Sequence, residues 1–402
     1  MATFFLMIIY LAFISLGLPD SLLGAAWPVM QSEFDAPLET AGMLFMIIAG
    51  STIVSSLASG PIIKRLGTGN ITLISCIMTA GALLGLSYAP SLLWLILFSV
   101  PLGLGAGAVD AGLNNYVATH YKAQHMSWLH CFWGVGATLG PIIMSQHIAN
   151  ENGWRDGYIV IFAVQVALVV LLFFTLPLWK RVAKTNSTDL IENQEDTQVA
   201  LHDEANKKIK PLQVKGVKLA LVTFLFYCGV EATMGLWGSS FLVNVKLLPA
   251  DVAARWVSMF YAGITVGRLV TGFIAYKVSN RTLIRVGQAT TLAGALLLVL
   301  PLPTICAFAG FIMVGLGCAP IFPCMLHETP VRFGKEHSQS IMGYQMAVAY
   351  TGSTLLPPLL GWFAAHTTIA IFPFFIAAYG IVMLVSSEKI NAFMKARLLQ
   401  NS

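Results

Sequence analysis

The feature that most constrains this chain is the near absence of charge along most of its length. Only 10% of the 402 residues are Asp, Glu, Lys or Arg, while 57% are hydrophobic. An ordinary soluble domain carries about 25% charged residues. A soluble protein of this size could not cover its surface with so few polar groups. The sequence therefore predicts an all-α membrane protein built from apolar helices.

A bilayer core about 30 Å thick is crossed by roughly 20 mostly apolar residues in a helix. Twelve runs of this kind occur in the sequence. The first run has no basic residues before it and continues as far as Trp27, so we expect a transmembrane helix there and not a signal peptide. The expected spans are 4–30, 40–63, 70–89, 91–118, 126–148, 158–179, 217–245, 254–276, 284–302, 304–326, 338–362 and 366–386.

The basic residues indicate how the chain lies in the membrane. Alternate connections, together with the C-terminal tail, carry 19 Lys and Arg residues, whereas the other connections carry only Arg155, Lys246 and Arg255. Positive loops stay in the cytoplasm, so we expect a multi-pass protein of the cell inner membrane with both termini cytoplasmic. This orientation accounts for the net charge of +5 without a nucleic-acid partner.

The longest polar segment divides the chain into two halves. Eight of the 23 basic and six of the 18 acidic residues lie in 180–218. The segment 185–206 is polar and nearly free of aromatic residues, which predicts a flexible linker. We expect an N-terminal six-helix bundle at 1–179, a cytoplasmic linker at 180–216, a C-terminal six-helix bundle at 217–388 and a cytoplasmic tail at 389–402.

The two halves repeat each other. An offset of about 212 residues places the Gly-Leu-Gly of 103–105 on that of 315–317, and the run 60–67 on the run 272–279. With a slightly different offset, the Gly-Ala-Thr-Leu-Gly-Pro of 136–141 falls on the Gly-Ser-Thr-Leu-Leu-Pro of 352–357. Three matches in the same order, on corresponding helices, predict a duplicated six-helix unit.

This layout resembles the major facilitator superfamily across the whole chain. The resemblance rests on the six-plus-six helices, the central linker, and the basic loops that follow helices 2 and 8. At the acidic position of that loop signature, this chain has Lys64 and Tyr276. The resemblance implies the major facilitator fold, with two pseudo-symmetric six-helix bundles, and a transporter that works by alternating access.

Three acidic residues lie within expected spans, namely Asp20, Asp110 and Glu231. A charged residue in mid-membrane costs roughly 2.5–3.5 kcal/mol, so such acids face a cavity, pair with a cation or become protonated. Burial disfavours the charged form of a carboxyl group, which makes all three candidates for proton coupling. Purely structural, hydrogen-bonded acids are the alternative. We expect the nearby Arg268 to extend toward the cytoplasmic face rather than neutralise them.

Further polar and aromatic residues share helix faces with these acids or lie on neighbouring expected helices. Carboxylates, amides and flat aromatic rings suit a sugar, whose hydroxyls form hydrogen bonds and whose C–H faces pack on rings. The alternatives are a membrane-interface role for the two Trp residues outside helix 5, packing for the His, and an interhelical tie for the Gln. The candidate substrate-binding residues are Trp27, Asn114, His130, Trp133, Trp237, Tyr344 and Gln345.

Within the superfamily, the pattern most resembles the fucose/galactose/glucose proton symporters. Those proteins carry an acid near the centre of helix 1, and in helix 4 a Gly-Leu-Gly segment, an acid and an Asn four residues later. Asp20, Asp110 and Asn114 match these positions. The resemblance implies that Asp20 and Asp110 serve proton coupling and the sugar site. In helix 5 this chain has His130 where that family has Gln, and Trp133 at the following Asn position.

Two other classes of function compete with sugar import. The pattern Gly136-x-x-x-Gly140-Pro141 resembles the core of the motif of proton-driven drug antiporters, although its terminal Gly-Gly is Met-Ser here. A non-transporting membrane sensor would need a soluble domain, for which we identify no segment.

No phosphate-binding loop, organised nucleophile or metal-type spacing of Cys or His occurs in the sequence. We therefore do not expect an enzyme, and we expect no cofactor. The energy source would be the proton gradient. The expected partners are protons, the bilayer and a small-molecule substrate, a sugar in the first instance, and we expect the chain to work as a monomer.

Overall fold

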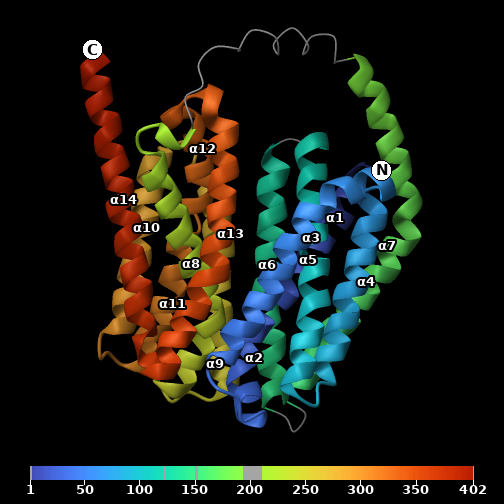
Figure 1. Cartoon of the computed structure of the whole chain (residues 1–402), viewed down its shortest axis with the longest axis vertical. Coiled ribbons are helices and arrows are strands. Elements are labelled where there is room, and N and C mark those ends of the chain that lie inside the picture. Colours follow the sequence, from blue (N-terminus) through green and yellow to red (C-terminus); the bar gives the residue numbers. More distant parts are fainter. Residues whose placement is uncertain (1, 122, 150–152, 193–210, 402) are drawn as a thin grey trace.

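The computed structural model describes residues 2–121, 123–149, 153–192 and 211–401, and within these ranges the chain forms helices and no strand. Figure 1 shows two helical bundles side by side, one built from the first half of the chain and one from the second. Both termini lie at the same end of the molecule, here called the termini end, and the opposite end is called the far end (Figure 1).

The N-terminal bundle contains seven helices. They are α1 (Ala2–Asp20), α2 (Leu22–Glu33), α3 (Thr40–Leu66), α4 (Thr68–Ser87), α5 (Leu92–His120), α6 (Ala123–Ile148) and α7 (Gly153–Glu192). The described C-terminal bundle contains α8 (Val217–Asn244), α9 (Ala250–Ile274), α10 (Asn280–Val299), α11 (Thr304–Cys318), α12 (Ile321–Phe333), α13 (Lys335–His366) and α14 (Phe372–Asn401). Short 3-10 turns, η2 (Pro211–Gln213) and η3 (Ile369–Ile371), precede α8 and α14.

The described helices confirm the predicted membrane architecture. Ten segments are long and apolar enough to cross a bilayer, with α1 and α2 counted as one span and α11 and α12 as another. The helices α6 and α13 are also long enough, with 26 and 32 residues, and complete the predicted twelve. Their composition is less apolar because they carry polar residues such as His130 and Gln345. Both helices pack against the opposite half of the protein.

Two of the predicted spans are broken rather than continuous. The first stops at Asp20 and resumes at Leu22, and the tenth stops at Cys318 and resumes at Ile321. A proline adjoins each break, Pro19 and Pro320 respectively. Proline lacks the backbone N–H and its ring displaces the carbonyl four residues earlier, so a helix bends or stops there. Irregular backbone at membrane depth is tolerated where it is buried in protein or lines a polar cavity. Asp20 therefore lies at a discontinuity of its span.

The helices at the boundaries of the bundles are longer than predicted. Part of the predicted linker at 180–216 continues α7 as far as Glu192, and the predicted tail at 389–402 continues α14 as far as Asn401. The prediction of a flexible segment from residue 185 is therefore wrong for 185–192. The remaining core of that linker, 193–210, lies outside the described residues.

The two halves contact each other closely at the far end. A Cβ atom on Gly24 of α2 would overlap the backbone carbonyl oxygen of Gly235 of α8. A Cβ atom on Gly42 of α3 would lie 2.9 Å from the Cα of Pro358 of α13. Small residues allow helix backbones to approach this closely in membranes. Trp237 fills the space beside this crossing, fully buried, and its indole Nε1–H donates to the carbonyl oxygen of Pro357 at 2.8 Å. We call Gly24, Gly42, Gly235, Trp237 and Pro358 the far-end seal.

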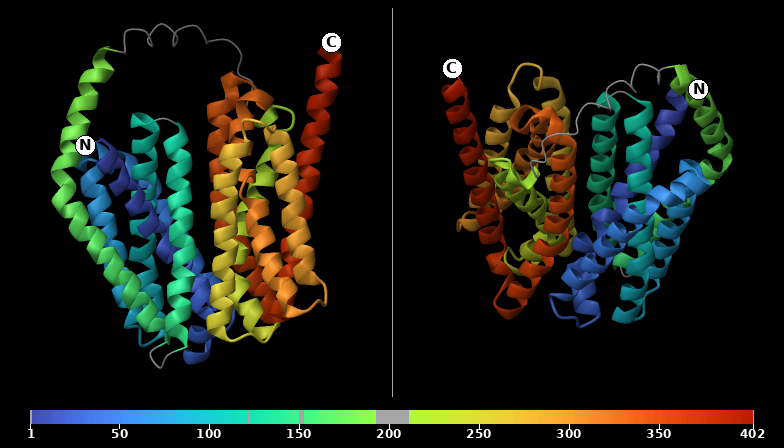
Figure 2. Two further views of the ribbon diagram at one scale, coloured as in Figure 1. Left: turned by 180° about the vertical axis from the view of Figure 1, so that it is seen from behind. Right: turned by 45° about the horizontal axis from the view of Figure 1, so that its top comes forward.

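Other contacts between the halves run along two seams. The helices α6 and α9 pack together, and α3 packs on α13. At the far end, the Ser239 hydroxyl of α8 points to the carbonyl oxygen of Ala25 at 3.4 Å. In the left view of Figure 2 the bundles also come together at the far end, where the blue α2 lies beside the yellow helices of the second half. The two halves are thus in close contact at the far end.

The far-end seal predicts the effect of adding bulk at the helix crossing. Gly24→Val should hold α2 and α8 apart, and thereby favour a conformation that is open at the far end. Ser239 is fully buried in the closed conformation. We therefore introduce a thiol with Ser239→Cys. Adding Gly24→Val should make this thiol react at least about tenfold faster than in the Ser239→Cys parent, because the open conformation would no longer be a minor species. Labelling with a water-soluble maleimide, read by peptide mass spectrometry, measures this rate.

The matched control for this experiment is Gly50→Val in the same Ser239→Cys background. Gly50 lies in α3, and an added Cβ there would meet no atom within 4 Å. Equal labelling of the thiol in the Gly24→Val, Gly50→Val and parent proteins would show that the crossing does not keep the far end closed.

Candidate functional site

The acid of the first span lies where solvent can reach it. Asp20 is the last residue of α1 and is exposed, although it belongs to a transmembrane span. Its Oδ2 accepts a hydrogen bond of 2.8 Å from the indole Nε1–H of Trp133, which is half-buried on α6. Asp20 therefore combines a fixed hydrogen-bond donor with an exposed side chain.

Trp133 carries this contact across to the other half of the protein. Its ring meets that of Tyr261 on α9 edge-on, with centroids 6.4 Å apart. On the same helix, the Arg268 guanidinium carbon lies 5.7 Å from the centroid of the Trp133 ring. A guanidinium within about 6 Å of an indole face is attracted by the ring quadrupole. One side chain of the N-terminal half thus contacts both an acid of its own half and a cation of the other.

Arg268 is paired within the membrane and does not extend to its surface, so the sequence-based expectation for this residue is wrong. Its guanidinium lies 3.6 Å from the Glu231 carboxylate on α8, and both side chains are largely buried, with 15% and 18% exposed. Tyr227, one helical turn before Glu231, donates its hydroxyl to Glu231 Oε2 at 2.5 Å and accepts from Arg268 at 3.4 Å. Extending to the surface would leave Glu231 without a cation, and a buried unpaired charge is costly.

The acid of α5 is held differently. One Oδ1 atom of Asp110 accepts from the side-chain amide of Asn114 at 2.8 Å, and the same amide lies 3.0 Å from the backbone carbonyl oxygen of Asp110. Both residues are half-buried. The predicted sharing of one helix face by Asp110 and Asn114 is thus seen as a direct contact. The α5 helix also contacts α1 and α6, which carry Asp20 and Trp133.

Two further predicted residues lie on helices that line the seams. His130 of α6 is half-buried, and its ring meets that of Phe13 edge-on with centroids 6.1 Å apart. This contact fits the packing alternative considered for His130. Tyr344 of α13 is 41% exposed. Within the described part of the chain, neither residue forms a hydrogen bond or ion pair with the three acids, so their roles in binding stay predictions.

Three of the predicted binding residues are buried in this conformation. Trp27 of α2 and Trp237 of α8 are both fully buried, in the hydrophobic core and in the far-end seal respectively. The Gln345 amide oxygen of α13 accepts a 3.0 Å hydrogen bond from the Thr329 hydroxyl of α12. Gln345 is therefore an interhelical tie here, and the two Trp residues are not membrane-interface residues. Contact with substrate would require another conformation.

The structure adds residues that were not singled out from the sequence. Tyr227 could have been found, because it precedes Glu231 by four residues and so shares its helix face. Tyr261 could not have been found from the sequence, and the pairing of Arg268, which was expected to extend to the membrane surface, could not have been foreseen. The contacts of both residues come from the packing of α9 on α6 and α8. The resulting central cluster consists of Asp20, Asp110, Asn114, Trp133, Tyr227, Glu231, Tyr261 and Arg268.

The charges and aromatic rings of the central cluster determine which solutes can bind there. It contains three carboxyl groups and a single guanidinium, so with all acids ionised its net charge is negative. The rings of Trp133 and Tyr261 provide flat apolar surfaces, and Asn114 provides an amide. Within the described ranges, no group of three or more His, Cys, Asp or Glu residues could hold a metal ion. Chemically, this arrangement can bind a polar solute and exchange protons.

The comparisons with known proteins identify the family. The model described as Major Facilitator Superfamily matches residues 9–357. The glucose/mannose transporter GlcP of Bacillus subtilis is 23% identical over 301 residues, covering 74% of this chain and 72% of that protein. The cis,cis-muconate transport protein of Acinetobacter baylyi is 24% identical, covering 68% and 66%. Bypass of stop codon protein 6 of Saccharomyces cerevisiae is 22% identical, and the alignment covers 56% of its length.

Solved structures show the same fold. A D-xylose-proton symporter superposes with a TM-score of 0.74, at 12% identity and 96% coverage of both chains. A peptide transporter superposes with a TM-score of 0.70, at 13% identity, covering 98% of this chain and 93% of that one. This chain belongs to the Major Facilitator Superfamily. It is a multi-pass membrane transporter and not an enzyme.

The pairing in the C-terminal half predicts a non-additive effect on stability. Arg268→Gln or Glu231→Gln should each lower the free energy of unfolding by about 1–3 kcal/mol, because the remaining charge loses its partner. The double variant should lose less than the sum of the two. Thermal unfolding of the purified proteins in one detergent gives the comparison.

Arg285→Gln serves as the control, because the Arg285–Glu388 pair is exposed and such pairs contribute about 0–1 kcal/mol. If the effects of Arg268→Gln and Glu231→Gln were strictly additive, or no larger than that of Arg285→Gln, the two residues would not form a stabilising pair.

Proposed function

We propose that this protein is a proton-coupled sugar symporter that works by alternating access. The observation that carries the proposal is the placement of Asp20, a carboxylate exposed to solvent at a break in a transmembrane helix. It has a hydrogen-bond donor in Trp133, and among the described residues it has no cation partner. A carboxylate in this situation can take up a proton from one side of the membrane and release it to the other.

The charges of the central cluster support a neutral solute. Three carboxyl groups and one guanidinium would repel an anion, unless protons were bound first. The two aromatic rings and the polar groups fit a ring of hydroxyls, because sugars pack their C–H faces on aromatic rings. A relative named as a glucose/mannose transporter and a structural neighbour named as a D-xylose-proton symporter support this class of substrate.

In the proposed cycle, Asp20 or Asp110 takes a proton while the protein is open to the outside. The loss of charge lets a neutral polar solute bind between the halves, which then rock about the site. The solute leaves into the cytoplasm, the proton follows, and the empty carrier returns. A membrane potential supplies about 2.3 kcal/mol per charge for each 100 mV. In this scheme the chain acts as a monomer in the inner membrane, with the termini end in the cytoplasm.

Proton-driven drug export is the alternative that the sequence left open. That alternative rests on Gly136 and Gly140, and the structure gives both glycines a packing role. A Cβ atom on Gly136 would overlap the carbonyl oxygen of Ile14, and one on Gly140 would lie 2.6 Å from that of Leu18. Both glycines therefore bring α6 close to α1, which explains the Gly-x-x-x-Gly pattern without an exporter. We rank symport first on this basis.

The proposal predicts that removing the Asp110 carboxyl group abolishes proton coupling but leaves the rocking of the two halves intact. In proteoliposomes tested with a panel of hexoses, Asp110→Asn should abolish uphill uptake driven by an imposed pH gradient. Counterflow exchange should persist, because exchange needs the rocking motion but no net proton release. Wild-type protein should accumulate at least one hexose only when the gradient is present.

Asp251→Asn is the matched control, since Asp251 lies in the first turn of α9 beside Arg255 and away from the central cluster. It should behave as wild type. Loss of counterflow together with uphill uptake in Asp110→Asn would assign Asp110 to structure or direct binding. If no hexose were accumulated but lipophilic cationic dyes were expelled, the chain would be an exporter.

A further inference from the structure

A second site lies at the termini end of the N-terminal half, away from the central cluster. A cavity of about 120 Å³ opens between the start of α4, the end of α5 and the α7 helix. Its walls include Gly67 and Thr68 at the start of α4, Tyr116 of α5 and Trp179 of α7. The Trp179 ring is so close to the first turn of α4 that a Cβ atom on Gly69 would lie 2.7 Å from its Cγ.

Two kinds of hydrogen-bond donor lie beside this cavity, whose lining is mainly apolar. The first backbone N–H groups of a helix have no partner within the helix. At α4 the residue before the helix is Gly67, which provides no side chain to cap them. Trp179 is only 5% exposed, and its indole Nε1–H has no acceptor among the described residues. An indole N–H can only donate. These N–H groups are therefore available to an acceptor from outside the described part of the chain.

The surrounding charge is positive. Lys64 and Arg65 form the last turn of α3, immediately before Gly67, and both are exposed. The start of α4 adds the partial positive charge of a helix N-terminus. None of the residues that line the cavity is acidic. An acceptor that binds here should therefore be an anion.

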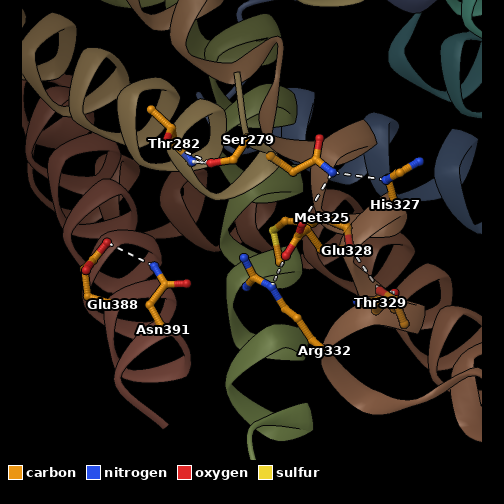
Figure 3. A network of polar contacts seen from close by, with 11 residues as sticks. Ser279, Thr282, Met325, His327, Glu328, Thr329, Arg332, Glu388 and Asn391 are labelled. Atoms are coloured by element: carbon orange, nitrogen blue, oxygen red, sulfur yellow. Dashed lines mark hydrogen bonds and ion pairs between the residues drawn. The ribbon is translucent and has the colours of Figure 1, made fainter. Parts of the chain in front are cut away.

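The C-terminal half shows how the equivalent helix start is capped by the protein's own side chains. The offset of 212 residues places Gly67 on Ser279 and Tyr116 on Glu328. The Ser279 hydroxyl accepts from the backbone N–H of Thr282, 3.3 Å away, and so caps the start of α10. The carboxylate of Glu328 accepts from the Asn280 side chain at 3.4 Å in the same first turn. Figure 3 shows this network, in which Arg332 also donates to Glu328.

The C-terminal half thus supplies its own cap and its own carboxylate, whereas the N-terminal half has Gly67 and Tyr116 at the matching positions. We propose that the cavity beside Trp179 binds a phosphate group. Helix N-termini with free N–H groups bind phosphate readily. At the end of a membrane-spanning bundle, that phosphate can come from a phospholipid headgroup or from a soluble phosphate. The two sources share the same chemistry, and they can be separated by experiment.

The test is the thermal stability of the purified protein in an uncharged detergent. Short-chain phosphatidylglycerol and inorganic phosphate are the two probes. Dioctanoylglycerol, which lacks the phosphate, and sodium chloride at matched ionic strength are their respective controls. A phosphate-bearing probe should raise the Tm of the wild-type protein in a saturable manner. A response to the lipid alone would assign a headgroup, and a response to inorganic phosphate as well would assign a soluble anion.

Variants show whether the response belongs to this cavity. Trp179→Phe keeps the ring but removes the N–H, and should raise the half-saturating probe concentration by about tenfold, as expected for a lost hydrogen bond to a charged group. Lys64→Gln combined with Arg65→Gln should also weaken binding. Tyr116→Glu would place a carboxylate as Glu328 does, and should abolish the response. Trp362→Phe is the control, because Trp362 lies on α13 and is 52% exposed.

The proposal is overturned if dioctanoylglycerol raises the Tm as much as phosphatidylglycerol and inorganic phosphate has no effect. It is also overturned if Trp179→Phe and the Lys64/Arg65 double variant both keep the wild-type half-saturating concentration. Should Tyr116→Glu fail to fold, these two variants alone decide the question.

Discussion

The structure depends on how charged side chains are accommodated inside a membrane. Each charge placed there must be paired, hydrogen-bonded or in contact with water. Arg268 and Glu231 satisfy each other within the C-terminal half, with Tyr227 as a third partner. Asp20 in the N-terminal half accepts the N–H of Trp133 and is exposed. Trp133 joins the two arrangements, because it contacts Asp20 with its nitrogen and Arg268 with its ring.

The internal repeat explains why these groups face one another, and also why they differ. An offset of 211 places Asp20 on Glu231 and Gly24 on Gly235, so each half has an acid one turn before a glycine. The two glycines meet at the far-end seal. The two acids have diverged: in the part of the chain that the structure describes, Glu231 has an arginine partner and Asp20 has none. We infer that the two acids have different roles: Glu231 is held in an ion pair, and Asp20 is free to exchange protons.

The fold could be predicted almost completely from the sequence, because the bilayer imposes a length and a composition on every span. Apolar runs located the helices, and the repeats located the two halves. The breaks at Asp20 and Cys318 were not predicted, since many transmembrane helices contain proline without stopping. The helical extension to Glu192 was missed because its composition is polar, and polarity alone does not distinguish a linker from a helix that continues beyond the membrane.

The site could be predicted only in part. Spacing within one helix correctly linked Asp110 to Asn114 and would also have linked Tyr227 to Glu231. Contacts between helices, such as Trp133 with Asp20 or Arg268 with Glu231, depend on packing that no local pattern encodes. Trp27 and Trp237 illustrate the same limit. Their type and depth fit a binding platform, but the packing of the halves buries both of them.

The central claim is that solute and protons move together through this protein. The most direct measurement uses proteoliposomes that contain a pH-sensitive dye, with no imposed pH gradient, to which a hexose is added outside. The account predicts that hexose entry acidifies the interior, and that the acidification disappears when Asp20 is replaced by Asn. Hexose entry at an unchanged internal pH would contradict it.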